Sequence, residues 1–527
     1  MRPALPALLL AAIVAAPAAA FAQPTRTIYL IAAGDTISAE RIRLRPGRFE
    51  DELLVRRAGQ RIRFAATVSD AGLLTRLDAA YHLAADSAGA PARSAATLDF
   101  RDDSVIIRTQ SGASAVERRV ASRAGVLPYL NPSFGLVELM IRRAHVLSAD
   151  SVELPVFSLS GGQTVAFWVK SLRPDSVVLS LGGVQARLAV DSAGGITGGW
   201  IPSQQIAIVV SDRADPTFFL GIAADYSAPP GAPYTAVEVT VPTPAGFTLA
   251  GTLTLPKGAK GPVPAVVTIT GSGLEDRDEA IPLVKGYRPF REIADALGRR
   301  GIAVLRMDDR GFGGSGGSAA TATSEDFAGD IRAGLAYLRT RPEIDGKRLG
   351  LAGHSEGGII APMIARTDST LKAIVLMAGS AWTGRRIMEY QNREALEHQP
   401  QLSAGARDSI LKTVVPQKLD SAIAAVPWLR FFATYDPVET ARQVRTPVLI
   451  LQGETDRQVP AEQAPELAAA FRAGGNRDVT LRLFPATNHL FLADPDGSPS
   501  GYPKLTTSRI RPEVLDTLVE WLVKRLR

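Results

Sequence analysis

The feature that most constrains the fold is the pentapeptide Gly-His-Ser-Glu-Gly at residues 353–357. An apolar run at residues 349–352 precedes it, and a helix-forming stretch at residues 358–365 follows it. A serine between a strand and a helix, with glycines two positions away on both sides, is typical of a sharp turn that exposes the hydroxyl, since side chains at the glycine positions would clash. The turn also puts the N–H of Glu356 at a helix N-terminus, where it can stabilise an oxyanion. The pattern predicts Ser355 as a nucleophile.

A nucleophilic serine needs a general base, and the chain contains five histidines. When the serine lies on a strand-to-helix turn, the acid and the histidine follow it along the chain, which sets aside the two histidines that precede it. His354 lies inside the turn, where its ring cannot readily reach the neighbouring hydroxyl. His398 belongs to a charged helical stretch, whereas His489 follows the alternating strand pattern at residues 479–483. We therefore predict His489 as the base.

The base needs a carboxylate that orients it and stabilises its charged form. Residues 446–452 are predicted as a buried parallel strand, and Asp456 lies in the loop that follows. Glu454 in the same loop is the closest competitor, and an ordinary loop acid before a helix is the alternative role for Asp456. Asp436, in another segment, is expected to be structural. Asp456 is the predicted acid.

A second oxyanion donor is expected after the β-branched run at residues 264–270, in Gly-Ser-Gly at residues 271–273. Small residues let a backbone N–H approach a substrate oxygen, so Ser272 and Glu356 are the predicted oxyanion hole. An ordinary tight turn is the alternative. The charged residues 275–279 that follow are most simply a salt-bridged loop, and binding of a charged substrate group is the other interpretation.

Residues 301–315 are predicted as a strand that continues into a Gly-rich loop. Neither a G-K-[ST] sequence nor a strand, G-x-G-x-x-G and helix in that order is present, so the loop does not fit a phosphate-binding site. We expect a structural loop beneath the active site.

The predicted secondary structure changes near residues 229–234, a predicted linker rich in Pro, Gly and Ala. Before the linker, over residues 24–228, short runs of alternating apolar and polar residues follow one another too closely for helices to fit between them. This spacing predicts an antiparallel β-rich accessory domain, built as a curved sheet or open barrel. Its role is either binding of substrate, cell envelope or a second subunit, or coverage of the other domain. After it, over residues 235–527, strands and helices alternate, which predicts a mostly parallel doubly wound sheet with its ligand site at the carboxyl ends of the strands.

About 65 residues, 381–445, interrupt this alternation with a helical insertion, which we interpret as a lid. Within it four aromatic residues recur at the spacing of one helix face, where they form either core or the roof of an acyl pocket; they are Trp428, Phe431, Phe432 and Tyr435.

Residues 1–22 combine Arg2, a short apolar core and Ala-Phe-Ala before Gln23, which predicts a Sec signal peptide cleaved after Ala22. The core is too short and Pro-interrupted to span a bilayer comfortably, and an uncleaved anchor is the alternative. No later stretch has the length of a transmembrane helix. We expect a soluble, exported protein, periplasmic or extracellular, with no membrane span after cleavage.

The absence of cysteine excludes disulfides, a cysteine nucleophile, Cys-ligated metals and a lipoprotein anchor at the cleavage site. The 59 basic and 53 acidic residues are interspersed rather than gathered into a basic stripe, so nucleic acid is not an expected partner.

With these residues identified, residues 235–527 resemble the α/β-hydrolase superfamily and, more narrowly, the secreted bacterial EstD-like esterases, whose hydrolase domain often carries the serine-aminopeptidase name. The motifs that carry the resemblance are residues 271–273, 276–279, 309–311, 353–358, 435–437 and 488–491. The family commonly has Pro where this chain has Leu274, a change that leaves the backbone donor intact. The resemblance implies a carboxylesterase that uses Ser355, Asp456 and His489.

The expected reaction is two-step acyl transfer from a small-molecule ester of small to medium acyl length to water, without a metal or organic cofactor. One alternative is a peptidase of the prolyl-oligopeptidase or aminopeptidase kind, which has the same triad and fold. Another is an inert hydrolase domain in a protein that acts by binding through its β domain.

Overall fold

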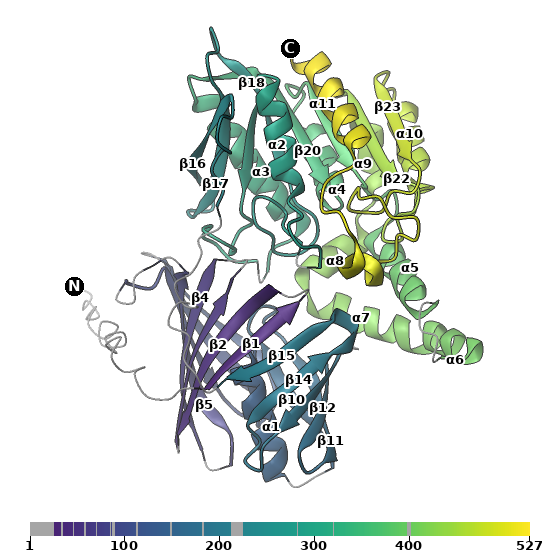
Figure 1. The fold of residues 1–527 in the computed structure, drawn as a ribbon. Coiled ribbons are helices and arrows are strands. Elements are labelled where there is room, and N and C mark those ends of the chain that lie inside the picture. The colour runs from purple at the N-terminus through teal and green to yellow at the C-terminus, as the bar shows by residue number, and fades with distance from the viewer. Residues whose placement is uncertain are drawn as a thin grey trace, which may run out of the picture. The chain divides into compact units, whose positions relative to one another are not determined.

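The computed structural model describes residues 26–527 apart from short gaps, and it divides the chain into two compact units, residues 1–224 and 225–527 (Figure 1). The expected signal peptide and His398 lie outside the described residues. No helix in the described part of the chain has the length and apolarity needed to cross a membrane. The gaps are residues 33–34, 46, 57–58, 70, 85, 87–89, 112–113, 148–149, 182–183, 212–224, 282, 320 and 398–401.

The N-terminal unit contains one fifteen-stranded sheet in the order β8-β7-β6-β5-β4-β3-β2-β1-β15-β14-β13-β12-β11-β10-β9. Neighbouring strands are antiparallel except β9 and β10, so the predicted antiparallel β-rich architecture is confirmed. The strands are β1 (Arg26–Ala32), β2 (Asp35–Arg45), β3 (Arg48–Val55), β4 (Gln60–Val68), β5 (Leu74–Leu83), β6 (Ser94–Phe100), β7 (Ser104–Ser111), β8 (Ser114–Ala121), β9 (Leu127–Tyr129), β10 (Ser151–Ser158), β11 (Thr164–Arg173), β12 (Ser176–Leu181), β13 (Val184–Val190), β14 (Ile196–Ile201) and β15 (Ile206–Ser211).

The expectation that no helix fits between these strands is wrong at α1 (Phe134–Val146). Ser133 caps this helix, since its side chain accepts a hydrogen bond from the N–H of Leu136. Buried apolar residues, among them Leu136, Met140 and Ile141, join the core of the sheet. The sequence does carry the signal, a serine N-cap followed by apolar residues at helical spacing, within a chain otherwise dominated by strands.

Two buried carboxyl groups, Glu40 and Asp51, lie at the N-terminus of α1. Glu40 on β2 accepts hydrogen bonds from the hydroxyl of Ser133 at 2.5 Å and from the N–H groups of Phe134 and Gly135 at 2.5 and 2.9 Å. Burial and the neighbouring Glu40 charge hold the pKa of Asp51 well above its usual range. Folding therefore disfavours the ionisation of Asp51 at this helix terminus.

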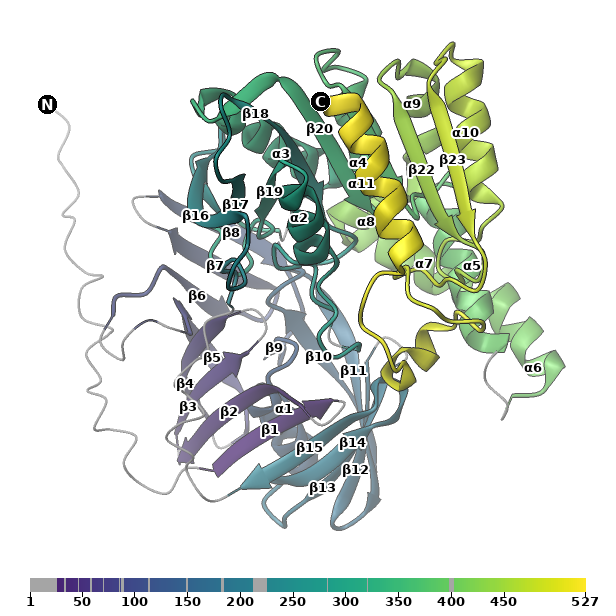
Figure 2. The same ribbon diagram turned by 45° about the horizontal axis from the view of Figure 1, so that its top comes forward.

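The C-terminal unit contains an eight-stranded sheet in the order β16-β17-β19-β18-β20-β21-β22-β23 (Figure 2). β17 runs antiparallel to β16 and β19, and the pairs from β19 through β23 are parallel. The predicted mostly parallel sheet is confirmed. The strands are β16 (Tyr234–Pro242), β17 (Thr248–Pro256), β18 (Val263–Ile269), β19 (Ala303–Met307), β20 (Ile344–His354), β21 (Ala373–Met377), β22 (Val448–Gly453) and β23 (Val479–Phe484).

Helices cover both faces of this sheet, because its central strands are buried on both sides. One face packs on α2 (Pro289–Arg299) and α11 (Pro512–Leu526). The other packs on α3 (Ser324–Thr340), α4 (Gly357–Ala365), α9 (Pro437–Gln443) and α10 (Gln463–Ala473). The unit is a doubly wound α/β fold.

The residues between β21 and β22 are largely helical, as predicted for the insertion. Trp428, Phe431 and Phe432 lie on α8 (Pro427–Thr434), and Tyr435 is the C-cap residue just after it rather than a residue of the helix. The other helices of the insertion before α9 are α5 (Gly384–Glu397), α6 (Ala404–Ser409), the π-helical turn Ile410–Val414 and α7 (Val415–Ala425).

We expect Asp51→Asn to make the N-terminal unit more stable than wild type, by a margin that grows as the pH rises. A carboxyl whose pKa is raised by folding stabilises the folded state fully below its unfolded pKa, about 4, and loses that contribution as the pH rises through the folded pKa. Asparagine does not titrate. Thermal melts of the full chain at pH 5 and 8 measure the difference.

Asp103→Asn is the matched control, because Asp103 is on the surface of the same unit, with a 73% exposed side chain. It should show no growing stabilisation at high pH. A constant or shrinking difference between Asp51→Asn and wild type would contradict the raised pKa of Asp51.

Candidate active site

Ser355 occupies a sharp turn between β20 and α4. Its φ angle is 53°, in the left-handed region that residues other than glycine seldom adopt. A Cβ added to Gly353 would lie 2.0 Å from the backbone oxygen of Gly357, and one added to Gly357 would lie 2.2 Å from that of Ile269. The two glycines are therefore required by close backbone contacts, and they hold Ser355 at the carboxyl edge of the sheet.

His489 and Asp456 are hydrogen-bonded partners in the loops after β23 and β22. Nδ1 of His489 lies 2.7 Å from Oδ2 of Asp456, and both side chains are buried. Gln452 donates to the same oxygen at 2.9 Å, while the N–H groups of Gln458 and Val459 donate to Oδ1 at 2.8 and 2.9 Å. Four donors fix the carboxylate. Because Nδ1 faces Asp456, Nε2 is the ring nitrogen available to a substrate-side group.

The loop after β18 and the start of α4 are joined through Glu356. The carboxylate of Glu356 accepts hydrogen bonds from Ser324 at 2.6 Å, from the indole N–H of Trp428 at 2.9 Å and from the side chain of Ser272. Burial raises the pKa of Glu356, although these donors oppose the rise. The backbone N–H groups of Ser272 and Glu356 have no acceptor among the described residues. Both N–H groups are thus available to an oxyanion.

A cavity of about 290 Å³ lies over this turn. Among the predicted site residues, Ser272, Ser355, Glu356, Trp428, Phe432 and His489 line it. Asp456 lies behind His489 and does not line it. Phe431 and Tyr435 are not lining residues either; their rings stack at 5.5 Å and pack against the core. The aromatic stripe therefore divides between pocket and core.

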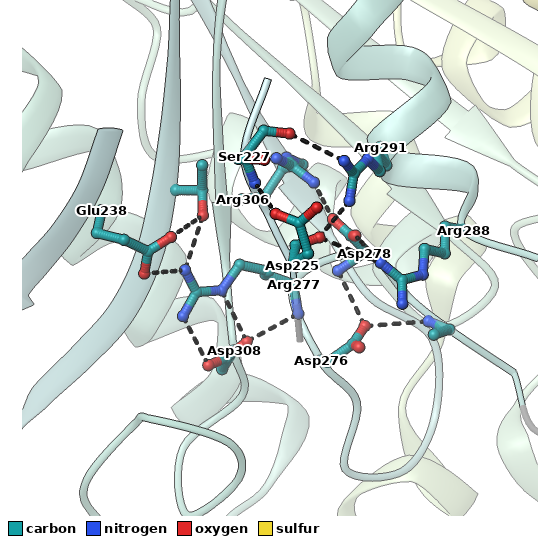
Figure 3. A network of polar contacts seen from close by, with 12 residues as sticks. Asp225, Ser227, Glu238, Asp276, Arg277, Asp278, Arg288, Arg291, Arg306 and Asp308 are labelled. Atoms are coloured by element: carbon teal, nitrogen blue, oxygen red, sulfur yellow. Dashed lines mark hydrogen bonds and ion pairs between the residues drawn. The ribbon is translucent and has the colours of Figure 1, made fainter. Parts of the chain in front are cut away.

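The charged residues Asp276, Arg277 and Asp278 belong to a buried polar network at the end of the Ser272 loop (Figure 3). Arg277 donates to both oxygens of Asp308, at 3.0 and 2.9 Å, and to Glu238 at 2.6 Å. Asp278 pairs with Arg306. Asp276 accepts hydrogen bonds from the N–H groups of Asp278 and Ala280. These residues form internal pairs, as the salt-bridged-loop interpretation expects.

Burial also changes the ionisation of this network. Burial, followed by repulsion from Arg277, lowers the pKa of Arg306 to about 10. Burial raises the pKa of Asp309 to about 8, although this carboxyl accepts hydrogen bonds from the N–H of Glu275 and the hydroxyl of Thr270. Asp309 begins the Gly-rich loop, which therefore packs against the Ser272 loop.

Sequence reasoning missed two groups that touch the predicted site. Gln452, the penultimate residue of β22, donates to Asp456, and Glu279 accepts a hydrogen bond from Gly271. A buried Gln inside an apolar strand was a visible signal. No sequence signal distinguished Glu279 from the charged residues around it.

Residues 283–497 match the model of the alpha/beta hydrolase family. The match lies within the C-terminal unit, whose doubly wound sheet has the α/β-hydrolase fold.

Two relatives are similar to this part of the chain. Esterase EstD of Thermotoga maritima is 27% identical over 282 residues, which cover 52% of this chain and 66% of EstD. The uncharacterized peptidase YuxL of Bacillus subtilis is 28% identical over 242 residues, which cover 43% of this chain and 31% of YuxL. Among solved structures, the esterase Pf2001 of Pyrococcus furiosus is 17% identical with a TM-score of 0.40, covering 58% of this chain and 96% of that chain. The chain thus spans slightly less than two thirds of the length of EstD and about a third of the length of YuxL.

We expect Arg277→Met to lower the free energy of unfolding by about 3–5 kcal/mol, because it leaves the buried carboxylate of Asp308 without its cation. Chemical denaturation followed by circular dichroism measures the change. Lys412→Met is the matched control: its ion pair with Asp408 is exposed and contributes about 0–1 kcal/mol. Equal effects of the two substitutions would contradict a structural role for the Arg277 network.

Proposed function

We propose that the protein is a serine carboxylesterase that hydrolyses small to medium acyl esters through an acyl-enzyme. The observation that carries the proposal is the 2.7 Å His489–Asp456 hydrogen bond, together with the single cavity that Ser355 and His489 both line. Ser355 lies on the strained turn that such a nucleophile needs. The 27% identity to esterase EstD agrees with this reaction.

In this proposal, Nε2 of His489 removes the proton of Ser355 as its Oγ attacks the ester carbonyl carbon, and Asp456 stabilises the imidazolium. The N–H groups of Ser272 and Glu356 stabilise the negative oxygen of the tetrahedral intermediate. The intermediate collapses when His489 gives its proton to the alkoxide, and the alcohol leaves. Water then attacks the acyl-enzyme with His489 again as base, and the acid and free Ser355 are released.

The size and the apolar wall of the cavity favour esters with short acyl chains. Its volume of about 290 Å³ is near the lower end of small-molecule sites, about 300–1,000 Å³. Apolar side chains from the helical insertion, Ile387, Met388, Trp428 and Phe432, contribute to its wall. Such a wall favours an acyl chain over a charged group, because a charge there would lose its hydration.

The same cavity is less suited to the ammonium group of an aminopeptidase substrate. Burial and the charge of Glu279 hold the pKa of Glu275 well above its usual range, which disfavours the charged carboxylate that a substrate ammonium would need. Glu279 contacts His354, and Glu356 accepts three donors from neutral side chains. The acidic groups are thus already engaged.

We also propose that the chain is exported by a Sec signal peptide at residues 1–22 and acts in the periplasm or outside the cell. Support comes from the sequence alone, in the apolar segment and the Ala-Phe-Ala before Gln23. Sequencing the N-terminus of the purified, exported protein tests this; a chain that still begins at Met1 would contradict cleavage.

We expect Ser355→Ala to abolish hydrolysis of p-nitrophenyl acetate and Asp456→Asn to lower kcat by about 10⁴-fold, because each removes one member of a unit that acts together. Glu454→Gln is the control for Asp456→Asn, since Glu454 lies two residues away in the same loop with an exposed side chain. It should keep wild-type kcat. Equal losses at the two positions, or full activity of Ser355→Ala, would refute the assignment.

A substrate panel separates the two hydrolase reactions. We expect kcat/KM to be highest for p-nitrophenyl esters of short acyl chains, to fall for long chains, and to be much lower for aminoacyl p-nitroanilides, because the cavity is small and its carboxyl groups are engaged. Feruloyl esters test a bulkier acyl group. Turnover confined to the aminoacyl amides would favour the peptidase instead.

A further inference from the structure

His354 and Glu279 form a buried pair that the proposed triad does not use. Nδ1 of His354 lies 2.7 Å from Oε1 of Glu279, and Nε2 lies 2.9 Å from the backbone oxygen of His489. A carbonyl oxygen only accepts, so Nε2 carries a hydrogen and donates it to His489. The contact between Nδ1 and Oε1 needs one further hydrogen, because a bare ring nitrogen and a carboxylate oxygen are both acceptors. The two side chains are 3% and 1% exposed, so solvent does not replace these contacts.

Glu279 also contacts the loop that carries the proposed oxyanion donor. Its Oε1 accepts a hydrogen bond from the N–H of Gly271 at 2.9 Å, and Gly271 directly precedes Ser272. The φ angle of Glu279 is 56°, a left-handed conformation that is unfavourable for a residue with a side chain. Such strain persists only where the surroundings hold it, and it is concentrated at functional sites.

His354 links Glu279 to the main chain of Ser355 and His489. It directly precedes Ser355, and the centroid of its ring lies 4.8 Å from that of His489. Phe491 packs edge-on against the other side of the ring, with centroids 6.1 Å apart. The ring is thus held between the backbone of the nucleophile and the backbone of the base.

We propose that Glu279 and His354 are positioning residues that fix the Ser272 loop, Ser355 and His489 relative to one another. Oε1 of Glu279 contacts both the N–H of Gly271, which precedes the proposed donor Ser272, and Nδ1 of His354. That ring in turn holds the main chain of His489. The inference rests on the proposed esterase function, because it assigns a role in the same reaction.

The electrostatic surroundings favour a charged pair, with His354 as the imidazolium and Glu279 as the carboxylate. Burial alone would lower the pKa of His354, but the Glu279 carboxylate outweighs burial and the net effect is a raised pKa. An imidazolium–carboxylate bond is about twice as strong as a neutral one, which suits a rigid support. The ionisable groups facing the pair are Glu275 on the Ser272 loop, Tyr287 before α2, Asp456 after β22 and His489 after β23.

The test compares four single variants with wild type on p-nitrophenyl acetate: Glu279→Ala, Glu279→Gln, His354→Gln and the control Glu292→Gln. Glu292 is a partly buried carboxyl on α2 whose pKa burial raises to about 7, and it does not line the cavity. Glu279→Ala should lower kcat by about 10- to 100-fold with KM within about threefold, since misplacement of reacting groups affects the transition state more than binding.

Glu279→Gln should recover only part of that loss, because its amide oxygen can keep the hydrogen bond from Gly271 but lacks the charge that stabilises the imidazolium of His354, and the same atom cannot donate to a neutral ring. Glu292→Gln should match wild type. A KM increase without a kcat loss in Glu279→Ala, or a kcat within about twofold of wild type, would overturn the positioning role. If circular dichroism shows that Glu279→Ala does not fold, the kcat and KM of His354→Gln test the positioning role with the same thresholds.

Ser355→Ala, measured in parallel, separates this inference from the proposed function. Activity that survives Ser355→Ala would refute the esterase mechanism itself. Activity lost in Ser355→Ala but kept in Glu279→Ala and His354→Gln would refute the positioning pair alone.

Discussion

The buried charges of residues 276–279 hold the loop on which the proposed chemistry depends. Each side chain of this run has a different partner: backbone N–H groups for Asp276, Asp308 for Arg277, Arg306 for Asp278 and His354 for Glu279. A buried charge without its partner costs several kcal/mol, so the four contacts strongly favour one arrangement of the loop. Through Glu279 the run also holds Gly271, the residue that precedes Ser272.

Close backbone packing imposes a second constraint at Ser355. Gly353 and Gly357 have no room for a Cβ, and Ser355 takes an unfavourable φ angle between them. Preorganisation of this kind is useful for acyl transfer, since donors that are already oriented need not reorganise as charge develops. The loop network and the serine turn meet where Ser272 and Glu356 hydrogen-bond.

Local patterns in the sequence predicted the alternating C-terminal fold and the positions of Ser355, Asp456 and His489, because each follows a recognisable strand. The helix α1 was missed because its flanks are dominated by strands. The contact between His354 and Glu279 joins positions 75 residues apart, and no local pattern encodes such a pairing. The division of the aromatic stripe between pocket and core likewise depends on which face of α8 meets the cavity, since Trp428 and Phe432 line it and Phe431 does not.

The central claim is that Ser355 is a nucleophile activated by His489. Treatment with a fluorophosphonate, followed by peptide mass spectrometry, tests it directly because the probe phosphonylates activated serines. We expect a single adduct on Ser355 in the wild-type chain and at least about a hundredfold slower labelling in His489→Ala. An adduct on another residue, or labelling of Ser355 at an unchanged rate without His489, would contradict the account.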